Sequence, residues 1–186
     1  MNRRRMLHSL KASAELGNFE DAAVLPADTD PQLYMSRNWL PQPFHLICEK
    51  DTVLSQLSGA AQVHLRDSSV NRFRMDVGDH VYVPAGTPHQ IVPLQEGVTI
   101  RYMPLRAGLQ GAAWFCAGCG SELHRYEWEH DNDTPAVRMY AAACARFTAD
   151  PAARTCGKCG EVHLRIDLES YGWQAPAPSA AAPAGR

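Results

Sequence analysis

Short runs in which apolar and polar residues alternate fill the middle of the chain, and turn residues separate them. Ala61 to Arg66 alternates regularly and is followed by Asp67-Ser68-Ser69, a turn sequence. Similar runs lie at Arg72–Met75 and Val98–Tyr102. Period-two strands with turn signals every roughly 8 to 12 residues are typical of antiparallel sandwiches and barrels. The pattern therefore predicts a mainly β domain.

Helical spacing of apolar residues is found on either side of this region. Residues 7–25 carry apolar residues at loosely helical spacing and Pro26 closes the segment, which predicts an N-terminal helix. A second helical stretch is expected around residues 134–147.

These changes of pattern predict four parts of the chain. They are an N-terminal helical segment (1–28), a β-barrel (29–108), a small module packed on the barrel (109–173) and a tail (174–186). The tail is rich in alanine and proline and has no side chains able to build a core, so we expect it to be disordered.

The stretch Val77–Ile91, VGDHVYVPAGTPHQI, combines residues that each suit one local geometry. Gly78-Asp79 predicts a tight turn and Val81–Val83 a short strand. In residues 84–88 two prolines fix φ and a glycine permits a sharp reversal. His89 then opens the next strand, so we expect this histidine at the mouth of the barrel.

Length and charge limit the possible partners. A chain of 186 residues can form one substantial core. The net charge of -2 does not favour nucleic acid or an anionic membrane surface. No apolar run has the length of a membrane span, and the basic start is not followed by the apolar stretch of a signal peptide. We therefore expect a cytoplasmic protein, in which paired cysteines indicate metal ligands before disulfides.

Two C-x-x-C-G sequences carry the strongest chemical signal in the chain. They place Cys116 and Cys119 in one turn and Cys156 and Cys159 in another. Each turn puts two sulfurs on one side, and two such turns complete a tetrahedral site for Zn²⁺ or Fe. A site with four protein ligands has no open position, so we expect this metal to be structural.

These motifs together resemble bacterial 3-hydroxyanthranilate 3,4-dioxygenase over about residues 40–165. The resemblance rests on Gln56-Leu57-Ser58-Gly59, Gly78-Asp79 through Pro88-His89, Arg106-Ala107-Gly108, and Trp114-Phe115 before the cysteine turns. It implies a cupin fold, a double-stranded β-helix or jelly-roll barrel, with a C-terminal rubredoxin-like four-cysteine site. It also implies Fe(II) in the barrel held by two histidines and a glutamate, a small aromatic substrate, O₂ as co-substrate and a homodimer.

The chain departs from this family where the barrel metal would bind. The ligand glutamate corresponds to Thr52, the first ligand histidine falls near Leu46, and His45 is one residue away. A displaced site of His45, His89 and Glu49 would restore two histidines and a carboxylate, with Asp51 as an alternative carboxylate and His64 as a further candidate ligand. Arg101 stands near the place of a family glutamate, and an arginine there would bind a substrate carboxylate in a bidentate manner.

Two hypotheses follow for the function. In the first, the chain is a metal-dependent oxidoreductase acting on a small aromatic or amino-acid-derived metabolite, with Glu49 and Arg101 as catalytic residues and His45, His89 and Glu49 around the metal. In the second, the chain is a non-catalytic cupin that binds a small molecule and retains only the structural four-cysteine metal.

Overall fold

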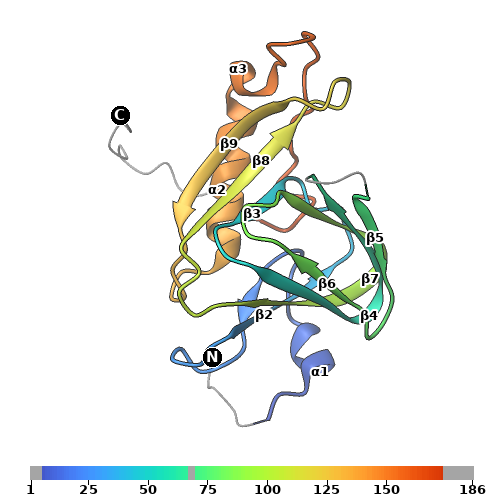
Figure 1. Ribbon diagram of the computed structural model, residues 1–186, viewed down its shortest axis with the longest axis vertical. Helices are drawn as coiled ribbons and strands as arrows, with labels where there is room; N and C mark the ends of the chain where they lie inside the picture. Colours follow the sequence, from blue (N-terminus) through green and yellow to red (C-terminus); the bar gives the residue numbers. More distant parts are fainter. Residues whose placement is uncertain (1–5, 67–69, 174–186) are drawn as a thin grey trace.

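One curled antiparallel sheet organises the molecule (Figure 1). The computed structural model describes residues 6–66 and 70–173. The expected tail (174–186) and the predicted turn at 67–69 lie outside the described residues. The mainly β cupin fold predicted from the sequence is confirmed.

The elements follow one another along the chain with short connections. The strands are β1 (Ala22–Ala23), β2 (Gln32–Asn38), β3 (His45–Cys48), β4 (Thr52–Leu65), β5 (Arg72–Met75), β6 (His80–Val83), β7 (His89–Met103), β8 (Leu109–Phe115) and β9 (Glu122–Glu129). The helices are α1 (Ser9–Ser13), α2 (Ala136–Ala149) and α3 (Pro151–Arg154).

The sheet curls because its two longest strands, β4 and β7, bend together. They pair along most of their length, with register shifts between Gln56 and Ala61. On one side of the bend β7 pairs with β3, and on the other side it pairs with β2. Bulges of this kind increase the local twist and bend a strand. The two halves of each strand therefore contribute to two different walls of the barrel.

Two glycines allow the strand backbones to touch at this bend. A Cβ atom added at Gly59 would lie 2.2 Å from the carbonyl oxygen of Glu96, and one added at Gly97 would lie 2.1 Å from that of Ser58. Gly59 also has a φ of +67°, a backbone conformation that residues with a Cβ atom rarely adopt. The tight bend therefore depends on the absence of side chains on both strands.

The N-terminal helix is present but shorter than the sequence predicted. It ends at Ser13, and residues 14–21 run on as irregular chain before β1. Phe19 and Asp21 have positive φ values of 48° and 45°, which are incompatible with a continuing right-handed helix. The second predicted helix is found as α2.

The sheet is continuous across the expected border between barrel and module at residue 108. β8 pairs with β3 on one side and with β9 on the other. Figure 1 shows α2 running alongside β8 and β9. One hydrophobic cluster joins barrel residues such as Leu46 and Val63 to Tyr140 and Phe147 of α2. The barrel and the module thus share a sheet and a core.

Aromatic rings fill the space between α2 and the sheet. The rings of Trp114 and Phe147 stack with centroids 4.1 Å apart, and Phe44 lies 5.0 Å from Tyr140. Pairs of this kind add roughly 0.5–1.5 kcal/mol to the gain from burial. These contacts hold α2 against β8 and against the segment before β3.

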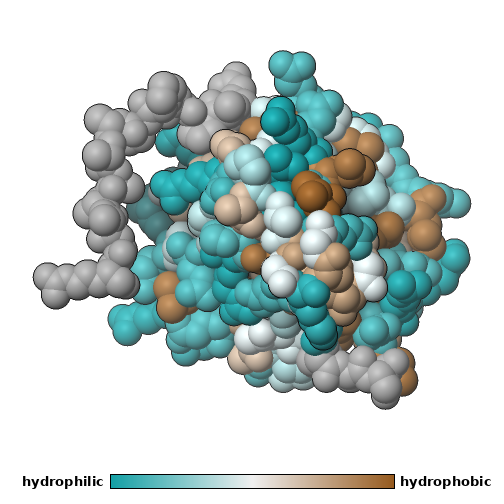
Figure 2. Space-filling model, turned by 90° about the horizontal axis from the view of Figure 1, so that it is seen from above, coloured by the Kyte–Doolittle hydropathy of each residue, from teal (hydrophilic) through white to brown (hydrophobic). Residues whose placement is uncertain are grey.

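The face of the molecule seen from above is mixed in polarity. The face seen in Figure 2 carries small hydrophobic groups separated by hydrophilic residues. Within residues 6–66 and 70–173, no helix combines the length and apolar character that crossing a membrane requires.

Gly59→Ala should destabilise the protein more than Gly86→Ala. Both glycines have positive φ, 67° and 74°, so either substitution costs roughly 1–2 kcal/mol in the backbone. An alanine at Gly86 meets nothing within 4 Å, whereas one at Gly59 collides with Glu96. We expect an additional loss of about 2 kcal/mol for Gly59→Ala in urea unfolding. Equal losses for the two variants would show that the bend tolerates a side chain.

Candidate functional site

Four cysteines from distant parts of the chain meet beside the end of β8. Their sulfur atoms all lie within 4.8 Å of one another. Cys116 and Cys119 follow β8, and Cys156 and Cys159 follow α3. The Sγ atoms of Cys116 and Cys159 are 3.4 Å apart, and those of Cys119 and Cys156 are 3.5 Å apart.

The two cysteine turns have the same backbone hydrogen bonds. The Gly120 amide donates to the Cys116 carbonyl over 2.9 Å, and the Gly160 amide donates to the Cys156 carbonyl over 2.8 Å. Both glycines have positive φ, 73° and 77°. A residue with a Cβ atom would strain this conformation, which explains the glycine after each C-x-x-C.

The four sulfurs fit a tetrahedral metal ion. Bonds of about 2.3 Å to a central Zn²⁺ or Fe place tetrahedral sulfurs about 3.8 Å apart, close to the distances in the structure. Hydrogen bonds from the hydroxyl and amide of Ser121 lower the pKa of Cys119 to about 6. The Cys119 amide opposes a rise at Cys116, but burial and the hydrogen bond with Cys159 raise the pKa of Cys116 to about 12, so Cys119 is the first of these two to form a thiolate. When bound, the metal would tie the β8–β9 connection to the segment after α3 and leave no position open for chemistry.

His89 is fully buried inside the barrel, with 0% of its surface exposed. Its Nδ1 lies 3.2 Å from the Thr87 carbonyl, to which it donates. Its Nε2 lies 2.6 Å from Nη1 of Arg101, which donates to it. Burial, followed by the charge of Arg101, holds the pKa of His89 well below its ordinary value. The imidazole is therefore neutral, and both nitrogens are engaged.

Arg101 is a buried cation at the centre of this network, with 2% of its side chain exposed. Its Nε lies 3.6 Å from Oδ2 of Asp21, and the Tyr140 hydroxyl donates to the same oxygen over 2.9 Å. Burial opposes the charged form, but the Asp21 carboxylate, with Cys48 and Tyr140, raises the pKa of Arg101 above its ordinary value. The guanidinium therefore stays charged inside the barrel.

The positions that correspond to the other two family ligands also face the barrel interior. Leu46 pairs directly with His89, and opposed residues of antiparallel strands project from the same face. Thr52 is on the same face of β4 as Leu54, which pairs with Arg101. The Thr52 hydroxyl donates to the Tyr102 carbonyl over 2.8 Å. An aliphatic side chain and a hydroxyl thus stand where an imidazole and a carboxylate were expected.

His45 lies on the opposite face of β3 from Leu46, because neighbouring strand residues alternate sides. Its Nε2 accepts a hydrogen bond from Nε of Arg66 over 3.3 Å, and its ring packs edge-on against Phe115. Arg66 also donates to the Gly120 carbonyl in the first cysteine turn. His45 therefore helps join the barrel wall to the four-cysteine turns and does not face His89.

Glu49 lies at the rim of the barrel, with 43% of its side chain exposed. One carboxylate oxygen contacts Lys50 and the other accepts from the Leu109 amide over 2.9 Å. These hydrogen bonds, first that of Leu109, lower the pKa of Glu49. The carboxylate anchors the start of β8 and does not point into the barrel.

The predicted barrel metal site of His45, His89 and Glu49 is therefore not assembled. The one-residue shift that would turn His45 inward is absent from the β3–β7 register. Within the described parts of the chain, the four cysteines alone form a group of three or more close potential metal ligands. The barrel interior as folded does not fit Fe(II), because the remaining ligand histidine is bonded to a cation.

Sequence reasoning missed Asp21 and Tyr140 as partners of Arg101. They lie in segments that the sequence placed outside the barrel, and no local motif links them to β7. A buried arginine inside a β-barrel requires a counter-charge. This requirement could have predicted a buried carboxylate near Arg101, but it does not identify Asp21 as that carboxylate.

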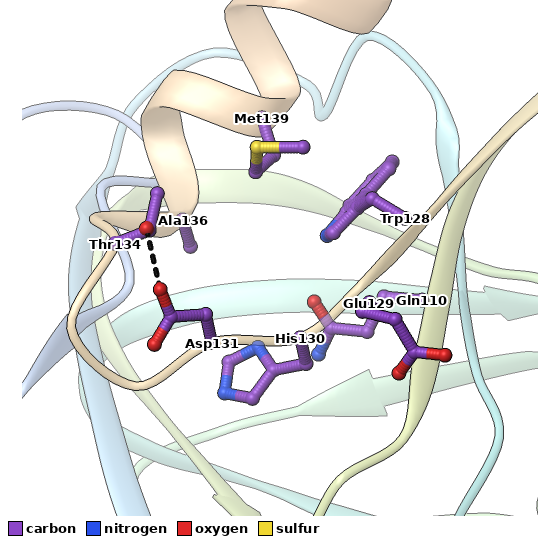
Figure 3. Close-up of a pocket in the computed structure, with 8 residues that line it drawn as sticks. All are labelled: Gln110, Trp128, Glu129, His130, Asp131, Thr134, Ala136 and Met139. Atoms are coloured by element: carbon purple, nitrogen blue, oxygen red, sulfur yellow. Dashed lines mark hydrogen bonds between the residues drawn. The ribbon is translucent and has the colours of Figure 1, made fainter. Parts of the chain in front are cut away.

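Two hollows lie away from this network. Figure 3 shows a cavity of about 40 Å³, with Gln110 and Trp128 from β8 and β9 facing Met139 of α2. It is far smaller than the roughly 300–1,000 Å³ of ordinary small-molecule sites. An open groove of about 500 Å³ next to α1 contains Arg37, which pairs with Glu96 on the surface.

Comparisons with known proteins point to the same family as the motifs. No protein-family model matches the chain. Over 89 residues the chain is 38% identical to a 3-hydroxyanthranilate 3,4-dioxygenase of Ruegeria pomeroyi, which covers 46% of this chain and 48% of that protein. Over 113 residues it is 28% identical to a protein of the same name from Podospora anserina, covering 58% and 60%. The chain thus matches about half the length of the first of these relatives.

Among solved structures, the chain is similar to a cupin-2 domain containing protein from Shewanella frigidimarina. The TM-score is 0.46 at 17% identity, over 54% of this chain and 94% of that one. The curated relatives, together with the curled sheet and the four-cysteine cluster, support a divergent cupin.

Cys116→Ser should release the metal and lower the melting temperature. Removing one thiolate leaves three ligands and detaches the β8–β9 connection from the segment after α3. Metal per chain, measured by elemental analysis, should fall from one to near zero. The exposed Lys158→Ala in the second turn serves as the control. Unchanged metal content and melting temperature in Cys116→Ser would contradict a four-thiolate site.

The stability of the protein should fall with acid partly through His45. Burial, then Arg66 and His64, lower its pKa to about 3 from 6.5. At pH values between about 3 and 6.5, His45 is protonated in the unfolded chain but neutral in the folded chain. The free energy of unfolding therefore decreases as the pH falls below 6.5. The loss from pH 7.5 to 5 is about 2 kcal/mol for this residue.

His45→Asn should therefore show a shallower fall in the free energy of unfolding over this pH range. Urea unfolding at both pH values measures it. The exposed His8→Asn is the control and should follow the wild type. Parallel curves for His45→Asn and wild type would rule out the contribution of this imidazole.

Proposed function

We propose that the chain is a divergent cupin that binds a small aromatic or amino-acid-derived metabolite in a barrel without an iron ion. The observation that carries this proposal is the 2.6 Å contact in which Arg101 occupies the ligand nitrogen of His89. The metal-binding site in this proposal is the group of four cysteines, which holds zinc or iron in a structural role.

The residues around the barrel centre suit the guanidinium of Arg101 better than a metal ion. A divalent cation needs neutral or anionic donors, and two of the three corresponding positions are Leu46 and Thr52. A guanidinium needs an acceptor and a counter-charge instead, and His89 supplies the acceptor while Asp21 supplies the negative charge. The barrel therefore keeps one positive charge at its centre while losing the open coordination positions on which O₂ chemistry depends.

The retained polar groups suit binding and orientation of a small polar molecule. Arg101 offers donors in a fixed planar fork, and its orientation is set by His89 on one side and Asp21 on the other. Tyr140 approaches from α2, so the element that closes the core also contributes to this site. The four-cysteine site anchors the segment that follows α2 and so helps to hold α2 in position.

A second candidate function is metal-dependent oxidation of such a metabolite, with O₂ as co-substrate. The similarity to two relatives named 3-hydroxyanthranilate 3,4-dioxygenase favours it. This function would require Arg101 to leave His89 and a carboxylate to approach the freed nitrogen, whereas the buried carboxylate of Asp21 pairs with Arg101. Glu49, the carboxylate predicted from the sequence, is bonded at the rim.

Metal stoichiometry and oxygen uptake separate the two functions. Purified protein loaded anaerobically with Fe(II) should retain one metal per chain, removable only on unfolding. It should consume no O₂ when 3-hydroxyanthranilate is added. A second, exchangeable iron with oxygen uptake would overturn the proposal and establish the oxidoreductase.

A reconstructed variant provides the positive control. Leu46→His, Thr52→Glu and Arg101→Leu together restore a histidine and a carboxylate and free His89. The triple variant should bind a second, exchangeable Fe(II), detected by elemental analysis before and after a weak chelator. Failure of this variant to gain iron would show that more than these three positions excludes the ion.

A further inference from the structure

Residues 18–21 carry the buried side chains of Phe19 and Asp21 into the barrel core ahead of β1. Phe19 is 0% exposed and belongs to the same hydrophobic cluster as Leu46 and Val63. Asp21 is 6% exposed and provides the carboxylate that faces Arg101. A segment that precedes the barrel in sequence thus occupies its interior.

The backbone of this segment is held in an unfavourable conformation. Phe19 and Asp21 both have φ values near +45°, a region that residues other than glycine rarely adopt. Neighbouring groups fix it there: the Phe19 amide donates to Asn38 over 2.9 Å, and the Trp173 indole donates to the Asn18 carbonyl over 2.8 Å. The surrounding structure thus imposes the geometry that directs Asp21 inward.

The contact between Asp21 and Arg101 leaves donor capacity unused. The Nε atom of Arg101 is buried and has no hydrogen-bond partner among the described residues, since Asp21 is 3.6 Å away. A bidentate carboxylate would approach a guanidinium more closely, at roughly 2.7–2.9 Å. Asp21, held in place by its backbone, therefore neutralises the charge of Arg101 but leaves the Nε atom of Arg101 without a hydrogen bond.

We infer that Arg101 and Tyr140 form a binding site for a small monocarboxylate, and that Asp21 occupies this site from within the same chain. This inference rests on the proposed function, since it names the ligand class of an ion-free barrel. One guanidinium and one phenol hydroxyl match a single carboxylate, whereas a phosphate dianion would remain incompletely neutralised.

The test is chemical rescue of an Asp21→Gly variant with sodium formate. Glycine suits the positive φ at this position, so the substitution removes the carboxylate and relieves the backbone. The melting temperature of Asp21→Gly should rise with formate and saturate. The apparent dissociation constant for formate should be roughly tenfold lower than in the wild type, where tethered Asp21 competes at a high effective concentration.

Matched controls isolate the carboxylate and the guanidinium. Sodium chloride at equal ionic strength and the neutral amide formamide should not reproduce the rescue. Asp21→Gly combined with Arg101→Met should lose the dependence on formate. If Asp21→Gly is poorly folded, Asp21→Ala replaces it, since alanine also vacates the carboxylate position and adds only the strain of a Cβ atom at positive φ.

The outcomes separate this inference from the proposed function. Indistinguishable responses to formate and chloride, or equal formate affinity in the wild type and Asp21→Gly, would overturn the carboxylate site. Metal per chain is measured on the same preparations. A value of one with no formate response refutes only the ligand class, whereas a second exchangeable iron refutes the ion-free barrel itself.

Discussion

The charge of Arg101 inside the barrel is the constraint on which the rest of the interior depends. A buried guanidinium without acceptors would cost several kcal/mol, so the surrounding groups must supply electron pairs. His89 gives one through Nε2, and Asp21 gives the compensating negative charge. Because Asp21 comes from the N-terminal segment and Tyr140 from α2, this single charge draws two distant parts of the chain onto the barrel.

The four-cysteine turns and the barrel are mechanically connected. Arg66, at the end of β4, donates both to His45 on the barrel wall and to Gly120 in the first turn. Its guanidinium also lies 4.0 Å over the ring of Phe115. The end of β8 is therefore held by a metal-binding turn on one side and by a barrel side chain on the other, which keeps the shared sheet in register.

Local patterns in the sequence predicted the features that local geometry controls. The C-x-x-C-G turns could be predicted because ligand spacing and the glycine conformation lie within five residues of each other. The turn before His89 predicted its place at the start of a strand and at the mouth of the barrel, whereas the structure buries its side chain completely. The role of His45 could not be predicted in this way, because a one-residue difference in strand register reverses the face of a side chain. Asp21 could not be predicted for another reason: its contact with Arg101 joins distant parts of the sequence, and no glycine marks the positive φ of this segment.

The strand β8 has hydrogen-bonded neighbours on both sides, β3 from the barrel and β9 from the module. Cutting the chain before β8 would turn β3 into an open border with unpaired amide and carbonyl groups, a surface on which other chains add strands. A barrel expressed alone would therefore tend to aggregate, and gradual loss of the module over evolution would have to preserve β8 or replace it. The module after residue 108 therefore also forms one wall of the barrel.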